Sequence, residues 1–293
     1  MTRKWIISYY LIAFLDILGQ SQEVLRLSRL PSNSEEEAHA AEILGSTAGH
    51  IKDIRQSFLG YFDARAKPTG ILDKLPPEKR EWANRMRRCE AEVRGLSDSI
   101  VITVPLSNED DHSTSMNGIY ATLFAICGIF VAALAERKPF RGGIDIGWGV
   151  RLTEQEVYGS ALVRAVSLES SVAQYPRVVI GNSLWDYLTE VEKLVTDTVF
   201  AKWARKTAAD CKMLVTEDCD GLRILDVIGA GARSVVDGIK PEWVGDAYKF
   251  VVGTHERLGK EGNMKLHTRY GWLRSYFESR LHFWGIPPVQ SGA

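Results

Sequence analysis

One uncharged run, Ile119 to Ala135, constrains the fold of this chain more than any other feature. Its 17 residues are at the lower length limit for a helix that spans a membrane. The run is interrupted by Gly128, and strand-like segments flank it closely on both sides. We therefore expect a core helix, from about Gly118 to Arg137, that lies buried against a sheet.

Strand-like runs and amphipathic helices follow one another along the first part of the chain. The capping-box pattern Ser34-Glu35-Glu36-Glu37 predicts a helix start, and apolar residues at three- and four-residue steps extend that helix to about Arg65. Other expected elements are strands at Trp5–Leu18, Phe140–Gly147 and Arg177–Ile180, a hairpin at Val93–Val104 with Ser97 and Asp98 in its turn, a helix after Gly159, and loops at Lys67–Gly70 and Ser107–Ser115. Strands and helices in this order predict a mixed sheet in an α/β or α+β core, and we adopt α+β.

The predicted strand at Phe140–Gly147 contains three glycines, Gly142, Gly143 and Gly147. Glycine within a strand often marks a place where another group approaches the backbone closely. We therefore expect close packing against this strand.

The C-terminal part reads as helices around one hairpin. Helical patterns cover Leu184–Ala209, Pro241–Gly259 and Asn263–Trp284. The dipeptide Asp220-Gly221 is a strong hairpin signal between two short apolar runs. These patterns predict two regions: a core over residues 1–183, and a helical and hairpin extension over 184–293 that packs on it.

Composition and charge exclude several classes of protein. Hydrophobic residues make up 45% and charged residues 25%, which is typical of a globular chain. There are 36 Lys and Arg against 37 Asp and Glu, so the formal charge is −1. Without a basic field or a dense basic stretch, we expect no nucleic-acid binding and no attraction to an acidic membrane surface.

The cysteines and the N-terminus both indicate a cytoplasmic protein. The four cysteines include no C-x-x-C pair, which favours a reduced protein without a zinc site. The basic and apolar N-terminus imitates a signal peptide, but the apolar run ends in Asp16 without a small-x-small cleavage site. We expect a buried first strand there.

Asp16 and Asp98 are the most informative pair of polar residues. Each follows an apolar strand-like run, where a charge is costly unless it has a partner. Two carboxylates at strand ends can hold a pair of divalent cations beside a phosphate. The alternative is that each aspartate only ends its strand in a turn.

Several short motifs occur in a specific order between residues 9 and 181. They are Phe14-Leu15-Asp16-Ile17-Leu18-Gly19, Leu96-Ser97-Asp98-Ser99-Ile100-Val101, Arg141-Gly142-Gly143-Ile144-x-x-Gly147, Tyr158-Gly159-Ser160-Ala161, Glu169, and Ala173-x-Tyr175-Pro176-Arg177-Val178-Val179-Ile180. Together they resemble class III nucleotidyl cyclases, and more closely the bacterial pyrimidine cyclases of the Pycsar antiphage system. The tail is similar too, through Asp218-x-Asp220-Gly221 and Arg269-Tyr270-x-Trp272-Leu273-x-x-Tyr276.

The resemblance implies a fold and a set of site residues. The fold is a mixed or antiparallel cyclase-like sheet flanked by helices. Asp16 and Asp98 match the aspartates that bind two Mn²⁺ or Mg²⁺ ions, with the Ile17 carbonyl as a further ligand. Arg94 stands where purine-specific relatives keep a base-reading Lys, and Glu156 where adenine-specific relatives keep an Asp. Either Arg94 reads a pyrimidine carbonyl or it is a solvated strand residue.

The chain departs from the wider class after Gly159. The class keeps an Asn and, four residues later, an Arg that stabilises the transition state, whereas this chain has Val163 and Ser167. Charge that develops on a phosphate needs a positive partner. Arg151, Arg164 and Arg177 are candidates for that role. Arg177, like Arg141, can equally be structural.

The resemblance implies a homodimeric cyclase that converts UTP to 3′,5′-cyclic UMP and pyrophosphate in antiphage signalling. Each active site would take its metals from one protomer and Arg94 and Glu156 from the other, and a separate effector would sense the cyclic nucleotide. The alternatives are the same reaction on CTP, less so on ATP, and an inactive cyclase-like module that senses nucleotides, which Val163 and Ser167 would suit.

Overall fold

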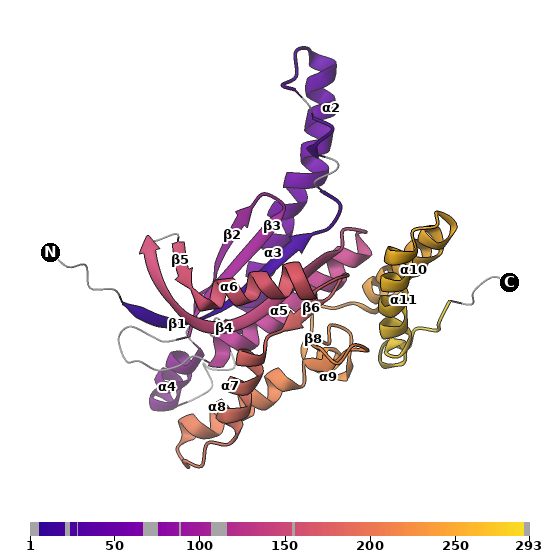
Figure 1. The fold of residues 1–293 in the computed structure, drawn as a ribbon. Coiled ribbons are helices and arrows are strands. Elements are labelled where there is room, and N and C mark those ends of the chain that lie inside the picture. The colour runs from indigo at the N-terminus through magenta and orange to yellow at the C-terminus, as the bar shows by residue number, and fades with distance from the viewer. Residues whose placement is uncertain are drawn as a thin grey trace.

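The computed structural model describes residues 6–20, 24–27, 29–66, 76–87, 89–106, 116–153 and 156–289. Over these ranges the chain is α+β, with a single open mixed sheet and helices on both of its faces (Figure 1). The loops expected at Lys67–Gly70 and Ser107–Ser115 lie outside the described residues.

The longest pairings of the sheet are centred on β1 (Ile7–Ile17). It pairs antiparallel with β3 on one side and with β4 on the other. The full strand order is β2-β3-β1-β4-β6-β8-β7, and β5 pairs with β4. The other strands are β2 (Glu92–Leu96), β3 (Ser99–Pro105), β4 (Phe140–Thr153), β5 (Glu156–Gly159), β6 (Val178–Ile180), β7 (Val215–Glu217) and β8 (Arg223–Leu225). Only β4 and β6 pair in parallel among these strands.

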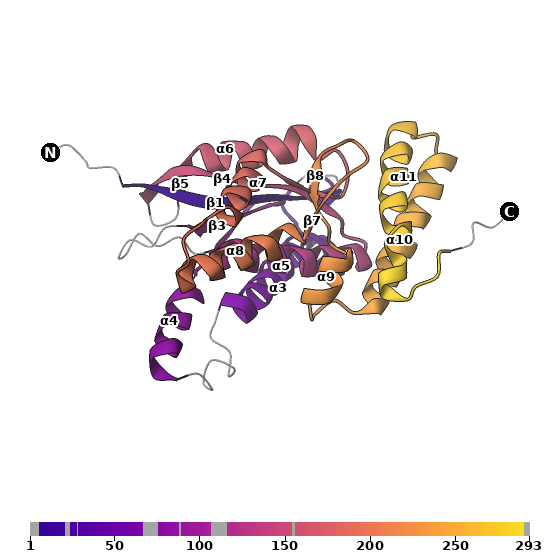
Figure 2. The ribbon, with the colours of Figure 1, turned by 90° about the horizontal axis from the view of Figure 1, so that it is seen from below.

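Two helical connections link β1 to β2 and β3 to β4, which gives the first four strands a split βαββαβ arrangement. The helices of these connections are α2 (Ser34–Leu44), α3 (His50–Ala66), α4 (Pro77–Arg87) and α5 (Met116–Ala135). Helices α3 and α5 pack on one face of the sheet, and α6 (Ser160–Ser167) lies on the other (Figure 2).

Alternation along β1 divides its side chains between the two faces. Leu11 and Leu15 belong to the large core beneath α3 and α5. Tyr10 and Ile12 pack with Ala161 and other residues of α6 in a smaller cluster on the opposite side. Because the side-chain period of a strand is two, the remaining even-numbered residues of β1, including Asp16, face the α6 side.

Helix α5 confirms the expected core helix. It is the one described helix that is apolar and long enough to cross a membrane, with a mean hydropathy of 2.2, but 83% of that apolar window is buried inside the protein. Burial on this scale is typical of a core helix in a soluble protein, since the flanking sheet and helices already cover it.

Helix α6 is what approaches the backbone of β4. A Cβ on Gly143 would lie 2.5 Å from the Ala165 carbonyl oxygen, and one on Gly147 would lie 2.5 Å from the Ser160 Oγ. Both glycines face α6 because they are register partners of even-numbered β1 residues. The expectation of close packing at this strand is therefore confirmed.

The helix expected from Ser34 to about Arg65 is present but interrupted. Asn33, rather than Ser34, provides the N-cap, since its side chain accepts the Glu36 amide at 2.9 Å. A π-helical turn at Gly45–Gly49 separates α2 from α3.

The C-terminal region continues the same sheet and core. The expected hairpin forms as β7 and β8, with Gly221 at φ +79° in its turn. The remaining helical segments are η3 (Leu168–Val172), α7 (Asn182–Glu192), α8 (Val199–Lys212), α9 (Ala230–Val235), α10 (Pro241–Lys260), α11 (Met264–Glu278) and η4 (Leu281–Trp284). Apolar residues of α10 and α11 belong to the same buried cluster as β1.

Candidate active site

Asp16 lies at the end of β1, on the α6 side of the sheet. Its carboxylate is mostly buried, with 21% of the side chain exposed. Ser99 is its register partner on β3, and the Ser99 hydroxyl lies 3.5 Å from Asp16 Oδ1. The end of the strand thus presents a carboxylate beside a hydroxyl.

Asp98 lies beside this position because a tight turn ends there. Ser97 and Asp98 connect β2 to β3, and Ser97 has a left-handed backbone with φ 57°. The Ile17 amide donates to the Asp98 carbonyl at 3.1 Å, which ties the turn to the end of β1. Both aspartates therefore stand at strand ends, as the sequence predicts, and their strands are neighbours.

Arg141 and Glu169 complete this group, which we call the Asp16 cluster. Arg141 is the register partner of Asp16 on β4. Its Nη2 lies 3.4 Å from Asp16 Oδ2, and its Nε lies 2.7 Å from Oε1 of Glu169. Glu169 comes from η3 and is buried. The cluster consists of Asp16, Asp98, Arg141 and Glu169.

The Asp16 cluster has more negative than positive charge, since it contains three carboxyls and one guanidinium. Burial raises the pKa of Asp16 above its usual value; Arg141 lowers this pKa and Asp98 raises it. Burial also raises the pKa of Glu169, again with Arg141 opposing and Asp16 adding to the effect. Ionised carboxylates are therefore less favourable here than in water, and a cation would stabilise them.

A divalent cation fits this charge imbalance. Among the described residues, no group of three or more His, Cys, Asp or Glu side chains is placed to hold an ion. Mg²⁺ usually takes only one or two carboxylates and completes its shell with water and substrate phosphates. Asp16 and Asp98 can supply those carboxylates for an ion that a bound phosphate helps to hold.

A second charged group, the Glu92 cluster, lies on the same side of the sheet. Glu92 forms ion pairs with two arginines: with Arg94 on its own strand, and with Arg151 on β4 at 2.5 Å. Arg151 also hydrogen-bonds Tyr10 of β1. The cluster consists of Glu92, Arg94 and Arg151.

The members of the Glu92 cluster lie at different levels along the strands. Arg94 is level with Phe14, two residues before Asp16, and Glu92 is level with Ile12, whereas Arg151 lies further away. Tyr10, which contacts Arg151, is six residues before Asp16 on β1, and this corresponds to roughly 20 Å. Glu156 lies further out on β5, opposite Thr153, with its side chain exposed. Within one chain, Glu156 and Asp16 therefore do not meet.

The outer surface of α6 carries Val163 and Ser167, the two positions at which the resemblance to class III cyclases leads us to expect an Asn and an Arg. Val163 is 66% exposed, and Ser167 is exposed as well. Between them, Arg164 donates to the Ile146 carbonyl at 3.1 Å and to the Ser183 hydroxyl at 2.7 Å. These three residues line a hollow of about 490 Å³ at the start of α7.

Arg177 occupies a different environment from Arg151 and Arg164. Its side chain is only 4% exposed, and it pairs with Asp218 at 2.7 Å and Asp220 at 2.8 Å. Its Nη2 also donates to the Val172 carbonyl at 3.0 Å. Arg177 thus fastens the β7–β8 turn to the start of β6.

Sequence reasoning did not assign three contacts that shape the site. They are the contact of Arg141 with Asp16, the bridge from Glu92 to two arginines, and the pairing of Arg177 with the hairpin aspartates. A signal existed for the last, because a charged residue beside a buried strand needs a partner of opposite charge. The first two depend on strand register, which the sequence alone does not give.

Comparison with known proteins adds no assignment. A scan of protein-family models finds no match to this sequence. A search of curated proteins also finds no significant match.

Proposed function

We propose that this protein is a cytoplasmic nucleotidyl cyclase that converts UTP to 3′,5′-cyclic UMP and pyrophosphate in bacterial antiphage signalling. The observation that carries the proposal is the Asp16 cluster, where two strand-end aspartates lie side by side with excess negative charge. The split βαββαβ order of the first strands is compatible with a class III cyclase fold.

The chemistry assigns distinct roles to the residues of the Asp16 cluster. Asp16 and Asp98 would hold divalent cations, with the Ile17 carbonyl as a further ligand. Two such ions, when bound, would favour ionisation of the ribose 3′-hydroxyl and neutralise the leaving pyrophosphate. Arg141 and Glu169 would position Asp16, because the Arg141 guanidinium lies between the carboxylates of Asp16 and Glu169.

A homodimer with shared sites is part of the proposal, and its support is that Arg151 and Glu156 lie far along the strands from Asp16 within one chain. A second copy running antiparallel would bring its Glu92 cluster to the Asp16 cluster of the first. The α6 side of β2 and β3 is suitable for such a contact, because Leu96, opposite Ser99, is 67% exposed. The exposed Val163 on α6 would lie beside the same interface.

Base selection is proposed for Arg94 and Glu156 of the second copy. The Arg94 guanidinium presents fixed donors that can meet the O2 or O4 carbonyl of uracil. Cytosine has an amino group in place of O4, so a donor aimed there would lose its acceptor. We therefore propose UTP as the preferred substrate, with CTP as the closest alternative.

The transition-state cation is proposed to be Arg151. It shares Glu92 with Arg94, so both arginines would enter the partner's site together. Arg164 is tied to the Ile146 carbonyl and to Ser183. Arg177 is buried between two carboxylates, which leaves its guanidinium little freedom to reach a phosphate.

A second candidate is a cyclase-like module that binds nucleotide without turning it over. The exposed, uncharged Val163 and Ser167 favour it, because neither can neutralise charge on a phosphate. If the chain is a cyclase, a separate effector would sense the cyclic nucleotide. If it is an inactive module, this chain itself would respond to nucleotide.

The experiment that separates these functions is product analysis. The purified protein is incubated with each of the four nucleoside triphosphates and Mn²⁺, and the products are identified by chromatography and mass spectrometry. Cyclic UMP as the main product supports the proposal, provided that Asp98→Ala and removal of Mn²⁺ both abolish it. Cyclic CMP would move the assignment to CTP, and binding without product would favour the inactive module.

A further inference from the structure

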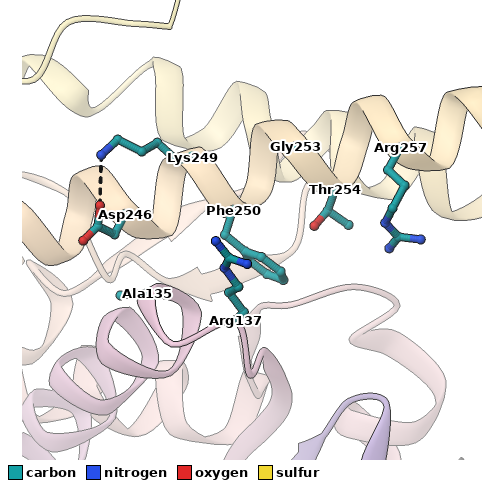
Figure 3. Close-up of a pocket in the computed structure, with 8 residues that line it drawn as sticks. All are labelled: Ala135, Arg137, Asp246, Lys249, Phe250, Gly253, Thr254 and Arg257. Carbon is teal, nitrogen blue, oxygen red and sulfur yellow. Dashed lines mark hydrogen bonds and ion pairs between the residues drawn. The ribbon is translucent and has the colours of Figure 1, made fainter.

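A cavity of about 630 Å³ lies between the end of α5 and one face of α10. Figure 3 shows the side chains of Lys249, Phe250, Thr254 and Arg257 along α10, with Arg137 opposite them. Arg137 follows α5 and precedes β4, on the far side of the sheet from α6. A cavity of this size is within the range of small-molecule sites.

The backbone at Arg137 has an unusual conformation. Its φ is 62°, a left-handed value at the end of a helix where glycine is the usual residue. The Arg137 and Lys138 amides donate to the carbonyls of Leu134 and Ala133. The last carbonyls of α5 are therefore capped, and an arginine stands in a turn that would be less strained with glycine.

Gly253 is the converse case, a glycine at a position where another residue would be more favourable. It lies inside α10, where glycine weakens a helix relative to alanine. A Cβ at this position would meet no atom within 4 Å, so packing does not require glycine. The missing side chain keeps the middle of the cavity open between Lys249 and Arg257, one turn to either side.

The polar groups of the cavity suit a phosphate. Arg137 forms no ion pair with any described carboxylate, and the Thr254 hydroxyl has no hydrogen-bond partner among the described residues. Among the described residues, Lys249 pairs with the exposed Asp246 of the same helix, and Arg257 pairs with the exposed Glu261, the residue that follows the helix. Such surface ion pairs are weak, so an anion that binds more strongly can displace their carboxylates. A guanidinium group can bind a phosphate through two parallel hydrogen bonds.

We propose that this cavity binds a small phosphate ester whose organic part contacts Phe250. Arg137 and Thr254 would bind the phosphate together with Arg257, and the half-buried Phe250 ring would pack against an apolar or ring-bearing portion. The site lies outside the Asp16 cluster and does not depend on the proposed cyclase activity. The backbone connects it to that cluster, since the Leu18 amide donates to the Pro139 carbonyl at 2.9 Å.

The test is calorimetric titration with phenyl phosphate, using benzoate as the ligand that lacks phosphate. The titrated chain carries Asp98→Ala, so that binding at the proposed metal site does not contribute. Arg137→Gly removes the cation and supplies the residue that the left-handed turn favours, so it should fold at least as well as the parent. Gly253→Leu fills the cavity, and Gly245→Leu is its matched control, since Gly245 lies on the same helix with no atom within 4 Å of its Cβ position.

We expect saturable binding of phenyl phosphate that weakens at least tenfold in Arg137→Gly and in Gly253→Leu, and less than twofold in Gly245→Leu. Inorganic phosphate should compete, and benzoate should bind at least tenfold more weakly. Absence of binding, equal binding of benzoate, or unchanged affinity in Arg137→Gly with its fold intact by circular dichroism would each overturn the proposal.

Discussion

At the scale of single residues, Asp16 lowers the stability of the folded chain because burial raises the pKa of its carboxyl. Between the unfolded and the folded pKa, the folded chain binds more protons than the unfolded chain. The free energy of unfolding therefore falls as pH rises through this window, and it stays lower at higher pH. The window begins near the usual Asp value of about 3.9.

We therefore expect Asp16→Asn to raise the urea midpoint at pH 7, and to raise it less at pH 4, while abolishing cyclisation. A gain in stability with a loss of activity is typical of a functional residue. Asp197→Asn is the control, because Asp197 is exposed and makes only a surface pair with Lys202. If Asp16→Asn lowered the midpoint equally at both pH values, Asp16 would instead be a structural partner of Arg141.

Arg177 should behave in the opposite way, as a residue needed for stability. Its replacement by Met would leave the buried Asp218 carboxylate without its main partner. We expect a loss of about 3 kcal/mol in the free energy of unfolding, measured by urea denaturation. Lys206→Met, which breaks an exposed pair with Asp210, should cost less than about 1 kcal/mol. Equal losses in the two variants would contradict a structural role for Arg177.

At the scale of elements, the sequence predicts most strands and helices but not their register or their caps. Apolar alternation indicates β1 directly, and the hairpin turns at Ser97–Asp98 and Asp220–Gly221 follow from turn chemistry. The π-helical turn at Gly45–Gly49 has no such signal, because the helical spacing of apolar residues continues through it. The strand glycines predict a close approach, but they do not say which element makes it.

The contact between α6 and β4 leads to a prediction about packing. In Gly143→Ala the new Cβ would lie 2.5 Å from the Ala165 carbonyl oxygen, so the helix would have to move. We expect a loss of about 1–3 kcal/mol and a lower melting temperature. Gly60→Ala is the matched control, since it has open space in α3 and should stabilise the chain by up to about 1 kcal/mol. Similar behaviour of the two variants would contradict the close contact.

At the scale of the whole molecule, the candidate site could be predicted only in part. Asp16 and Asp98 are adjacent because neighbouring strands end together, which the sequence indicates once a sheet is assumed. Glu92 joins Arg94 and Arg151 across β2 and β4, two strands that are not neighbours in the sheet. Contacts of this kind depend on the strand order and on side-chain length, so no local pattern gives them.

The shared-site dimer can be tested by mixing two inactive chains. One carries Asp98→Ala and the other Arg94→Ala. In a random mixture half of the dimers would be mixed, and each mixed dimer would have one intact site, so about a quarter of the wild-type activity should return. Subunit exchange is confirmed separately by native mass spectrometry. No recovery in exchanged dimers would mean that each site lies within one chain.

The central place of β1 in the sheet also affects how the protein is made. Both neighbours of β1 come later in the chain, and Ile17 pairs with Phe140 only after α2, α3, α4 and α5 have been synthesised. At ordinary translation rates this delay is on the order of ten seconds. Until β3 is synthesised the apolar β1 has two unpaired edges, and until β4 follows it still has one. Unpaired edges are sites of aggregation in a nascent chain. Production of this protein should therefore depend on chaperones and on growth temperature more than its finished, continuous core would suggest.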